Sequence, residues 1–380
     1  MIQIQQVDVR DTKAVDRFIQ IPFDLYAGHP QWVPPFISDV KNMLNPEKHP
    51  YYEHSDADFF VAIKDGKAVG RIAALENKPF NRYHNAKDAE FYLFECINDF
   101  EVAKGLFETV FEWAKNRGLN KLVGPKGFGP LDGYGIQIEG FEHRQMMNMM
   151  NYNFPYYRDL VEKMGFVKAV DFVSSYMKPH SFKLPEKVKK AAKIAKKRGS
   201  FKILTFKNKR ELKKWSGPIG KAYNAAFVDN WEYYPLSERE IDFVVDNVMT
   251  IVDPHMIKII TKDDKVVGFV LPFPDVSAAM QKNKGRLGPI AILRLLMEIK
   301  KTDWIAFNGV GILPEYQGLG GNAIMYAELE KALHQNTQFI HAELTQVAET
   351  AEQMRKDLKN LGVKFYKNHR VYQRELSLEG

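Results

Sequence analysis

A glycine-rich turn in the last quarter of the chain has the residue types that hold an anion. The segment GVGILPEYQGLGGNAIMYAEL places an apolar, strand-like stretch before Gly318, Gly320 and Gly321 and a helix-like stretch after them. Backbone N–H groups in such a turn, with the unpaired N–H groups of a helix start, favour a phosphate or pyrophosphate. We predict that the helix begins near Asn322. A strand-to-helix turn that binds no ligand is the alternative.

Two common phosphate-binding patterns do not fit this turn. A Rossmann loop has G-x-G-x-x-G early in the chain and an acidic residue about twenty positions later, whereas the glycines here are spaced differently and come late. The P-loop pattern G-x-x-x-x-G-K-[ST] does not occur. The turn is therefore expected to hold a pyrophosphate in another structural setting.

At this turn the sequence resembles the GNAT superfamily of N-acetyltransferases, whose signature [RQ]-x-x-G-x-[GA] follows the fourth strand. Gln317 and Gly320 match it, while Asn322 stands where the family has Gly or Ala, and Ala323 follows. GKAVGRIAALEN and GFEHRQMMNMMNYNFPYYRDLVEKMGFVKAVDF are similar to a bacterial group of tandem GNAT-like proteins. The resemblance spans nearly the whole chain. It implies an α/β fold of two tandem GNAT-like domains, each a mixed, bent sheet flanked by helices.

The resemblance also implies a co-substrate and the residues that bind it. In the superfamily the fourth and fifth strands splay apart, and the pantetheine of acyl-CoA inserts between them. We therefore expect acetyl-CoA or another acyl-CoA as co-substrate. The implied strand residues are Val310, Gly311, Ile312 and Leu313, and the implied pyrophosphate loop is Gln317, Gly318, Leu319, Gly320, Gly321, Asn322 and Ala323.

Candidate catalytic residues are less clearly marked. Acyl transfer to an amine needs a base for the amine and an acid for the leaving thiolate. Many GNAT members carry an Asn and a Tyr in the last helix, but Ala351 and Leu358 stand at those positions. Glu343 and His341 share one face of the predicted fifth strand, so they are candidate bases if that face lines the cleft, and ordinary surface residues otherwise. Tyr366 is a candidate acid if the final strand returns toward the cleft.

The two halves of the chain repeat one order of elements. Each reads as helices, a β-hairpin, then strand, helix, strand, helix, strand, which indicates a duplicated domain. We predict a degenerate GNAT-like domain over 1–180 without a CoA loop, a basic linker helix over 181–200, and a GNAT domain with the loop over 201–380. The first domain is expected to be degenerate because Asp99 and Glu101 stand where phosphates would sit.

Other patterns make local predictions. One helix is expected over 209–228, and another over 155–164 with Asn153 as its cap. The basic stretch 186–198 is amphipathic, so it is a solvated connecting helix or else a surface for polyanions or membranes. Asp132, in the loop 124–140, is a candidate for a position near a ligand.

Composition limits the class of protein. Apolar residues make up 45% and charged residues 27% of 380 residues, the net charge is +7, and Cys96 is the single cysteine. The chain begins without a signal-peptide pattern and has no run of about eighteen apolar residues, so we expect a cytoplasmic protein without a membrane partner. We expect no nucleic-acid partner, because the excess positive charge is concentrated in 186–198. No metal is expected, because the histidines lack ligand spacing. The oligomeric state is left open.

Together these features predict an acyl-CoA-dependent N-acyltransferase that acts on a small amine or amino-acid-like acceptor. Two alternatives stay open. One is a non-catalytic CoA-binding or sensor protein, which the missing Tyr in the last helix favours. The other is an acyl or aminoacyl transferase with a polyanionic donor such as aminoacyl-tRNA, which the basic stretch favours.

Overall fold

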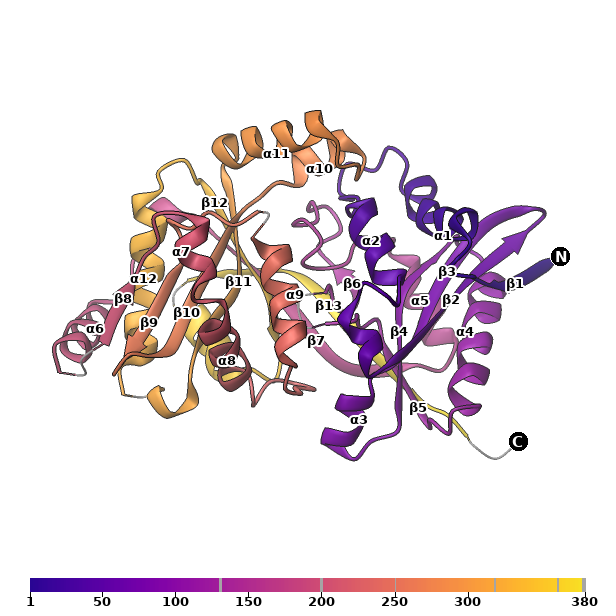
Figure 1. The fold of residues 1–380 in the computed structure, drawn as a ribbon, viewed down its shortest axis with the longest axis horizontal. Coiled ribbons are helices and arrows are strands. Elements are labelled where there is room, and N and C mark those ends of the chain that lie inside the picture. The colour runs from indigo at the N-terminus through magenta and orange to yellow at the C-terminus, as the bar shows by residue number, and fades with distance from the viewer. Residues whose placement is uncertain (130–131, 199–200, 250, 318, 361, 378–380) are drawn as a thin grey trace. The chain divides into compact units, whose positions relative to one another are not determined.

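The structure, a computed structural model, describes residues 1–129, 132–198, 201–249, 251–317, 319–360 and 362–377. By their internal contacts the residues form two compact units, which are taken in turn below. The first comprises Met1–Val173, Ser277–Arg294 and Tyr366–Gly380, and the second comprises Ser174–Val276 and Leu295–Phe365. Figure 1 gives the order of the elements along the chain.

The first unit contains a mixed sheet. Its strands pair in the order β1–β2–β3–β4–β5–β13, and β6 also pairs with β13. The β2–β3 hairpin confirms the predicted turn, since Asp65 and Gly66 both have positive φ, of 51° and 76°. The strands are β1 (Ile2–Gln6), β2 (Asp56–Lys64), β3 (Lys67–Glu76), β4 (Asp88–Cys96), β5 (Lys121–Gly124), β6 (Ile136–Glu139), the start of β7 (Val167–Met177) and most of β13 (Lys364–Glu375).

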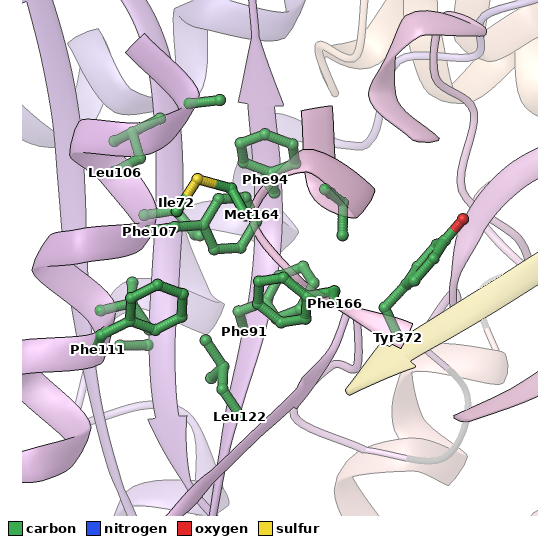
Figure 2. Packing of buried hydrophobic residues seen from close by; sticks show 14 of the residues in the cluster. Ile72, Phe91, Phe94, Leu106, Phe107, Phe111, Leu122, Met164, Phe166 and Tyr372 are labelled. Carbon is green, nitrogen blue, oxygen red and sulfur yellow. The ribbon is translucent and has the colours of Figure 1, made fainter. Parts of the chain in front are cut away.

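Helices cover this sheet and bury an aromatic core. They are α1 (Thr12–Leu25), α2 (Ile37–Leu44), α3 (Lys78–His84), α4 (Phe100–Lys115) and α5 (Tyr156–Lys163), with short 3-10 turns at Pro50–Glu53 and, in the second unit, Pro179–Ser181 and Pro314–Tyr316. Phe107 of α4 lies 5.2 Å from Phe91 of β4 and 5.1 Å from Phe166, measured between ring centroids. Figure 2 shows these rings with Tyr372 of β13 beside them, and Tyr372 is fully buried. The last strand of the chain therefore completes the core of the first unit.

The second unit contains a mixed sheet as well. Its strands pair in the order β12–β11–β10–β9–β8, with β11 and β12 parallel and the remaining pairs antiparallel. The bounds are β8 (Phe201–Leu204), β9 (Lys258–Lys262), β10 (Lys265–Pro274), β11 (Trp304–Ile312) and β12 (His341–Ala348). A strand, a loop and a helix follow one another at β11 and α12 (Gly321–Gln335), as the sequence predicts.

The remaining helices of the second unit have clear local causes. They are α6 (Glu186–Arg198), α7 (Lys209–Lys213), α8 (Ser216–Ala226), α9 (Glu238–Val248) and α13 (Glu352–Asn360). Ser237 and Glu240 form a reciprocal capping box that starts α9. The single helix predicted over 209–228 is wrong, because the chain breaks at Trp215 and starts again with Pro218 in the first turn of α8.

One further prediction needs correction. The first turn of α5 is not capped by Asn153, because that side chain accepts from the backbone N–H of Gln137 at 2.7 Å and donates to its carbonyl at 3.1 Å. By internal contacts, Ser277–Arg294 and Tyr366–Gly380 group with Met1–Val173 in the first unit. The predicted GNAT-like domains over 1–180 and 201–380 stay a prediction.

Two helices of the structure were not predicted from the sequence. α10 (Ser277–Asn283) and α11 (Pro289–Lys301) follow β10 and precede β11, and Figure 1 shows them as consecutive orange coils. α11 is short and largely apolar. No helix in the described ranges is long and apolar enough to cross a membrane.

Candidate functional site

In the second unit, β11 and β12 pair over part of their length and then separate. Their parallel register runs from Trp304 opposite His341 to Phe307 opposite Leu344, and both strands continue past that point. β11 stays paired with β10 as far as Ile312. The edge of β11 that faces β12 is therefore released beyond Phe307, as the expected splay of the fourth and fifth strands requires.

A bulge in β11 marks the point of separation. Asn308 and Gly309 lie opposite the single residue Leu271 of β10, because the register shifts between Val270 and Pro272. Gly309 has a φ of 131°, a conformation that favours glycine, and a Cβ there would lie 2.9 Å from the Leu271 side chain. Sequence reasoning did not single out Asn308, although its position places it where the released edge begins.

The predicted loop joins this edge to α12. Gly320 is the N-cap residue of α12 with a φ of 94°, so the helix begins at Gly321 and not at Asn322. A Cβ on Gly321 would lie 2.6 Å from the carbonyl oxygen of Tyr316, which explains the second glycine. The Gln317 side chain donates to the carbonyl of Ile312 at 3.2 Å. Gly318 lies outside the described residues, and Leu319 is exposed.

The first N–H groups of α12 are available for an anion. The N-cap residue Gly320 has no side chain, and the helix shows no side-chain cap. A helix start of this kind attracts negative charge through its free N–H groups. Ala323 occupies the first turn of the same helix. The loop and the helix start thus have the chemistry that a pyrophosphate needs.

Helix α6 packs directly against this loop. A Cβ on Gly320 would lie only 2.4 Å from the Cβ of Ala195, and Ala195 is buried. Lys196 pairs with Glu328 of α12 at 3.0 Å, and Lys189 approaches Glu330 at 3.4 Å. The predicted helix over 186–198 is confirmed, but it is packed on α12 and not a solvated connection. The last two residues of the predicted linker range lie outside the described residues.

Among the buried polar atoms that have no partner in the described part of the chain, two lie close in sequence to the turn and to the point where β12 leaves β11. They are Oδ1 of Asn322, in the first turn of α12, and Oγ1 of Thr345, directly after the last residue of β12 that pairs with β11. Buried polar atoms are nearly always hydrogen-bonded, so an unpartnered atom calls for an explanation. A ligand along the released edge would supply one. Sequence reasoning missed Thr345, because a Thr in a strand is an ordinary residue.

The two candidate bases differ in their surroundings. Glu343 is fully buried on the paired part of β12, so the alternative that it is an exposed surface residue is excluded. His341 begins β12, stacks on Trp304 at 4.6 Å and has its Nδ1 2.7 Å from the Tyr176 hydroxyl. It lies three residues, or roughly 10 Å along the strand, before the last paired residue, away from the loop.

Two aromatic residues are placed by other contacts. Tyr366 belongs to the first unit, where its ring lies 4.7 Å from the ring of His143, whereas Glu343 belongs to the second unit. Tyr326 of α12 donates to Asp357 of α13 at 2.9 Å, and burial raises the pKa of its hydroxyl above the ordinary value. Tyr326 is thus a packing residue.

The first unit shows the same strand separation, but tyrosines occupy it. β4 and β5 pair only from Asp88 to Glu90, while β4 continues to Cys96. Tyr157 of α5 accepts from the N–H of Cys96 at 3.0 Å, and Tyr156 donates to its carbonyl at 2.7 Å. The neighbouring N–H, of Ile97, points to β3, so these bonds lie on the β5 side of β4. At Cys96, the backbone N–H and C=O on this side of β4 are therefore already hydrogen-bonded.

An acidic residue also stands at the helix start of the first unit. Asp99 is the N-cap of α4 and accepts from the N–H of Glu101, and it pairs with Lys64 at 2.5 Å. The hydrogen bond from Lys64 holds the pKa of the Asp99 carboxyl below its usual range. The carboxylate thus occupies the place where a helix start would bind an anion.

A buried network in the first unit was not predicted from the sequence. The Glu95 carboxyl accepts from the hydroxyls of Tyr26 and Tyr157 at 2.7 Å and 2.8 Å, and the Arg71 guanidinium lies 3.8 Å from it. Burial raises the pKa of Glu95, while Arg71 acts in the opposite direction. These residues are far apart in the chain, so no local sequence pattern predicts the network.

Asp132 belongs to the loop that the sequence singled out, in which residues 130–131 lie outside the described ranges. Its carboxyl accepts from the N–H of Gly129 at 2.9 Å, and burial raises its pKa to about 6. A Cβ on Gly127 would lie 2.3 Å from the Cβ of Asp132, so the loop closes tightly around this residue. This hydrogen bond orders the loop. The position of Asp132 near a ligand stays a prediction.

The described residues hold no group of three or more His, Cys, Asp or Glu side chains that could bind a metal ion. The donor set of the site consists instead of backbone N–H groups, amides and a hydroxyl. These are groups that bind a phosphate or an amide-containing chain.

The chain has the fold of the GNAT N-acetyltransferases in its tandem form, which confirms the predicted fold class and the resemblance at the level of the fold. A tandem GNAT protein from the clavulanic acid biosynthesis pathway, solved without AcCoA, aligns over 99% of both chains with a TM-score of 0.56 and 12% identity. A GCN5-related N-acetyltransferase from Sphaerobacter thermophilus aligns over 99% of this chain and 96% of its own, with a TM-score of 0.50 and 12% identity.

Two curated proteins are similar along nearly their full length. Protein YghO of Escherichia coli (strain K12) is 25% identical over 366 residues, which cover 94% of this chain and 92% of that protein. The bacterial ceramide synthase of Caulobacter vibrioides (strain NA1000 / CB15N) is 24% identical over 376 residues, which cover 97% of each. No family model matches the chain.

Proposed function

We propose that this protein is an acyl-CoA-dependent N-acyltransferase whose second unit binds the acyl-CoA. The observation that carries the proposal is the separation of β11 and β12 directly before the left-handed turn at Gly320 and the uncapped start of α12. A released strand edge can bind the amides of pantetheine, and the turn can bind the pyrophosphate. The GNAT fold supports this activity in general.

The parts of acyl-CoA are assigned to distinct residues. The backbone of β11 and the residue after it bind the pantetheine amides, and the turn with the first turn of α12 binds the pyrophosphate. Asn322 and Thr345 gain partners for their buried oxygens when the ligand binds. The strand residues are Val310, Gly311, Ile312 and Leu313; the loop residues are Gln317, Gly318, Leu319, Gly320, Gly321, Asn322 and Ala323.

Helix α6 adds positive charge beside the turn. Its contact between Ala195 and Gly320 places the C-terminal end of a helix rich in lysine next to the proposed pyrophosphate site. Lys196 is bound to Glu328, and Lys197 and Arg198 are exposed. Positive charge here favours the phosphates of CoA and makes its affinity depend on salt.

Acyl transfer requires one proton to leave the amine. The amine nitrogen attacks the thioester carbon, the C–S bond breaks, and the proton passes to a base while the thiolate of CoA leaves. Glu343 is the proposed base, since a buried carboxylate beside the separating strands can take that proton. His341 holds the start of β12 through Tyr176 and Trp304 and is assigned a positioning role.

The first unit is proposed to be a degenerate copy that binds no CoA. Tyr156 and Tyr157 satisfy the strand backbone that pantetheine would use, and Asp99 occupies the helix start. Introducing a ligand would require breaking these bonds and desolvating a carboxylate next to a phosphate, which is unfavourable.

Isothermal titration calorimetry with CoA tests the binding half of the proposal. We expect one CoA per chain, and we expect Gly320→Asp to abolish binding, because it places a carboxylate at the turn. Gly362→Asp is the matched control, since Gly362 also has a positive φ, of 74°, and has open space around it. Wild-type protein that binds no CoA at millimolar concentration, or equal losses in both variants, would contradict the proposal.

A second candidate function differs from the first in the chain length of the acyl donor and of the acceptor. The relative named bacterial ceramide synthase aligns over 97% of both chains, and this favours a long-chain acyl-CoA with a long-chain amino alcohol as acceptor. Release of free thiol should be measured with acetyl-CoA and palmitoyl-CoA, each against amino acids and a sphingoid base. Turnover only with the short substrates favours a small amine, and turnover only with the long ones favours the second candidate.

The same assay separates the remaining alternatives. A sensor or purely CoA-binding protein binds CoA in the calorimeter but releases no thiol above background with any acceptor. A transferase with a polyanionic donor instead binds tRNA in a salt-sensitive way, and charge reversal in α6 removes that binding.

A further inference from the structure

Helix α11 exposes an apolar surface that the proposed chemistry does not use. Of its thirteen residues, five large apolar side chains are between 43% and 69% exposed. Ala291 and Leu295 are buried, so only one narrow stripe of the helix packs inward. The exposed side chains are Ile290, Ile292, Leu293, Leu296 and Met297.

These side chains form one continuous outward surface. Ile290, Leu293 and Met297 follow the i, i+3, i+7 spacing of a single helix face, and Ile292 and Leu296 form the adjoining row. Because all five belong to one unbroken helix, the helix alone fixes their arrangement. Isolated exposed apolar residues are normal, whereas a contiguous patch of this kind marks an interaction surface.

Basic residues surround the apolar surface. Between residues 282 and 301 the sequence has six Lys or Arg residues and a single acidic residue, Glu298. All six basic residues are exposed: Lys282, Lys284, Arg286, Arg294, Lys300 and Lys301. A protein partner with an apolar groove would not need this charge. An anionic surface would be attracted by it.

We infer that α11 (Pro289–Lys301) is an interfacial helix that docks the protein on the surface of a bilayer containing anionic phospholipid. Apolar side chains enter the boundary between headgroups and acyl chains, and the flanking Lys and Arg side chains bind the lipid phosphates. A helix of thirteen residues lies in the plane of the membrane and does not cross it. The inference rests on α11 alone and does not depend on the proposed function.

Vesicle cosedimentation with the full chain tests the inference. Vesicles of phosphatidylcholine with one quarter phosphatidylglycerol should pull down the wild-type protein, and vesicles of phosphatidylcholine alone should bind it much less. The double variant Ile290→Gln/Leu293→Gln should bind the anionic vesicles roughly tenfold more weakly or worse. The matched control Val167→Gln/Ile340→Gln removes two apolar side chains that are 59% and 48% exposed elsewhere, and it should bind as wild type.

The contribution of charge is tested on the same vesicles. Lys300→Gln/Lys301→Gln should weaken binding, whereas Lys187→Gln/Lys190→Gln in the more strongly basic helix α6 should not. Equal losses in both pairs would show that net charge alone attracts the vesicles and would overturn the inference.

Two further measurements keep the test decisive. Leu293→Trp should show a blue shift in fluorescence when anionic vesicles are added, and Val167→Trp should not. Absence of wild-type binding, or of that shift, overturns the inference. Light scattering after size exclusion, without lipid, tests for a second copy as the partner. A dimer that Ile290→Gln/Leu293→Gln dissociates would overturn the inference as well.

Discussion

The contact between Gly320 and Ala195 allows a quantitative test of how the loop is built. G320A places a methyl group 2.4 Å from the Ala195 Cβ at a residue with a φ of 94°. The left-handed conformation costs a non-glycine residue about 1–2 kcal/mol. Because two carbon atoms normally stay about 3.5–4.0 Å apart, α6 must also move by more than about 1 Å, and such overpacking costs about 1–3 kcal/mol. The expected loss of unfolding free energy is about 2–5 kcal/mol.

A second variant separates these two costs. A195G removes the other methyl group and should relieve the overpacking of about 1–3 kcal/mol when added to G320A. Because it also destabilises α6 by about 1 kcal/mol, the net recovery should be about 0–2 kcal/mol. G362A is the control for the left-handed conformation without a close neighbour and should cost only about 1–2 kcal/mol. Urea unfolding followed by tryptophan fluorescence measures the unfolding free energy of these four variants and of the wild type.

The double-mutant cycle can refute this reasoning. If the losses from A195G and G320A add within about 0.5 kcal/mol, the two residues are not in contact and α6 does not pack on the loop. If G320A costs no more than G362A, the steric cost is absent. The affinity for CoA, measured by calorimetry, should fall in the same order as the stability of these variants, because α6 packs against the turn that is proposed to bind the pyrophosphate.

Three other outcomes follow from buried ionisable groups. Glu343→Gln should lower kcat by roughly 10²–10⁴-fold with an unchanged Kd for CoA, and an equal loss of CoA affinity would assign Glu343 to binding instead. Burial lowers the pKa of His369 to about 3, so the imidazole stays neutral in the folded protein. In the unfolded chain the same imidazole binds a proton below its ordinary pKa of about 6.5. Stability should therefore fall by about 1.4 kcal/mol per pH unit as the pH drops below about 6.5; His369→Gln should flatten this slope in urea unfolding, and an equally steep slope in the variant would contradict the assignment. The pKa of Asp132 is raised to about 6, so its stabilising contribution is present below about pH 4 and lost as the pH rises through 6. Asp132→Asn should thus raise stability by about 1–3 kcal/mol at pH 8 but not at pH 4, and a loss at pH 8 would show that the charged form holds the loop.

Elements with local causes were predictable from the sequence. The β2–β3 hairpin follows from Asp65-Gly66, and the order of β11, loop and α12 follows from the apolar strand and the glycines. The packed state of α6 was not predictable, because its alternation of alanine and lysine also fits a solvated helix. The deciding fact is the small size of Ala195 and Gly320 at one point of contact.

Residues that act through tertiary contacts left no signal in the sequence. Glu95 meets Tyr26 and Tyr157 across more than sixty positions of the chain in each case. Thr345 becomes notable only because β12 leaves β11 directly before it. Helix α11 was missed for a different reason. Its apolar residues cover an exposed face as well as the buried stripe, so the sequence does not show the single apolar stripe of an ordinary surface helix.

The C-terminal strand has a consequence for the synthesis of the protein. β13 pairs with β5 and β6, and Tyr372 is buried in the core of the unit that begins at Met1. These residues follow every other strand and helix of the fold in the sequence, so the N-terminal unit cannot complete its core until β13 has left the ribosome. A nascent chain of 1–180 therefore exposes the β5 edge and the apolar surface that Tyr372 later covers. Such a chain needs protection from aggregation until the whole protein is made.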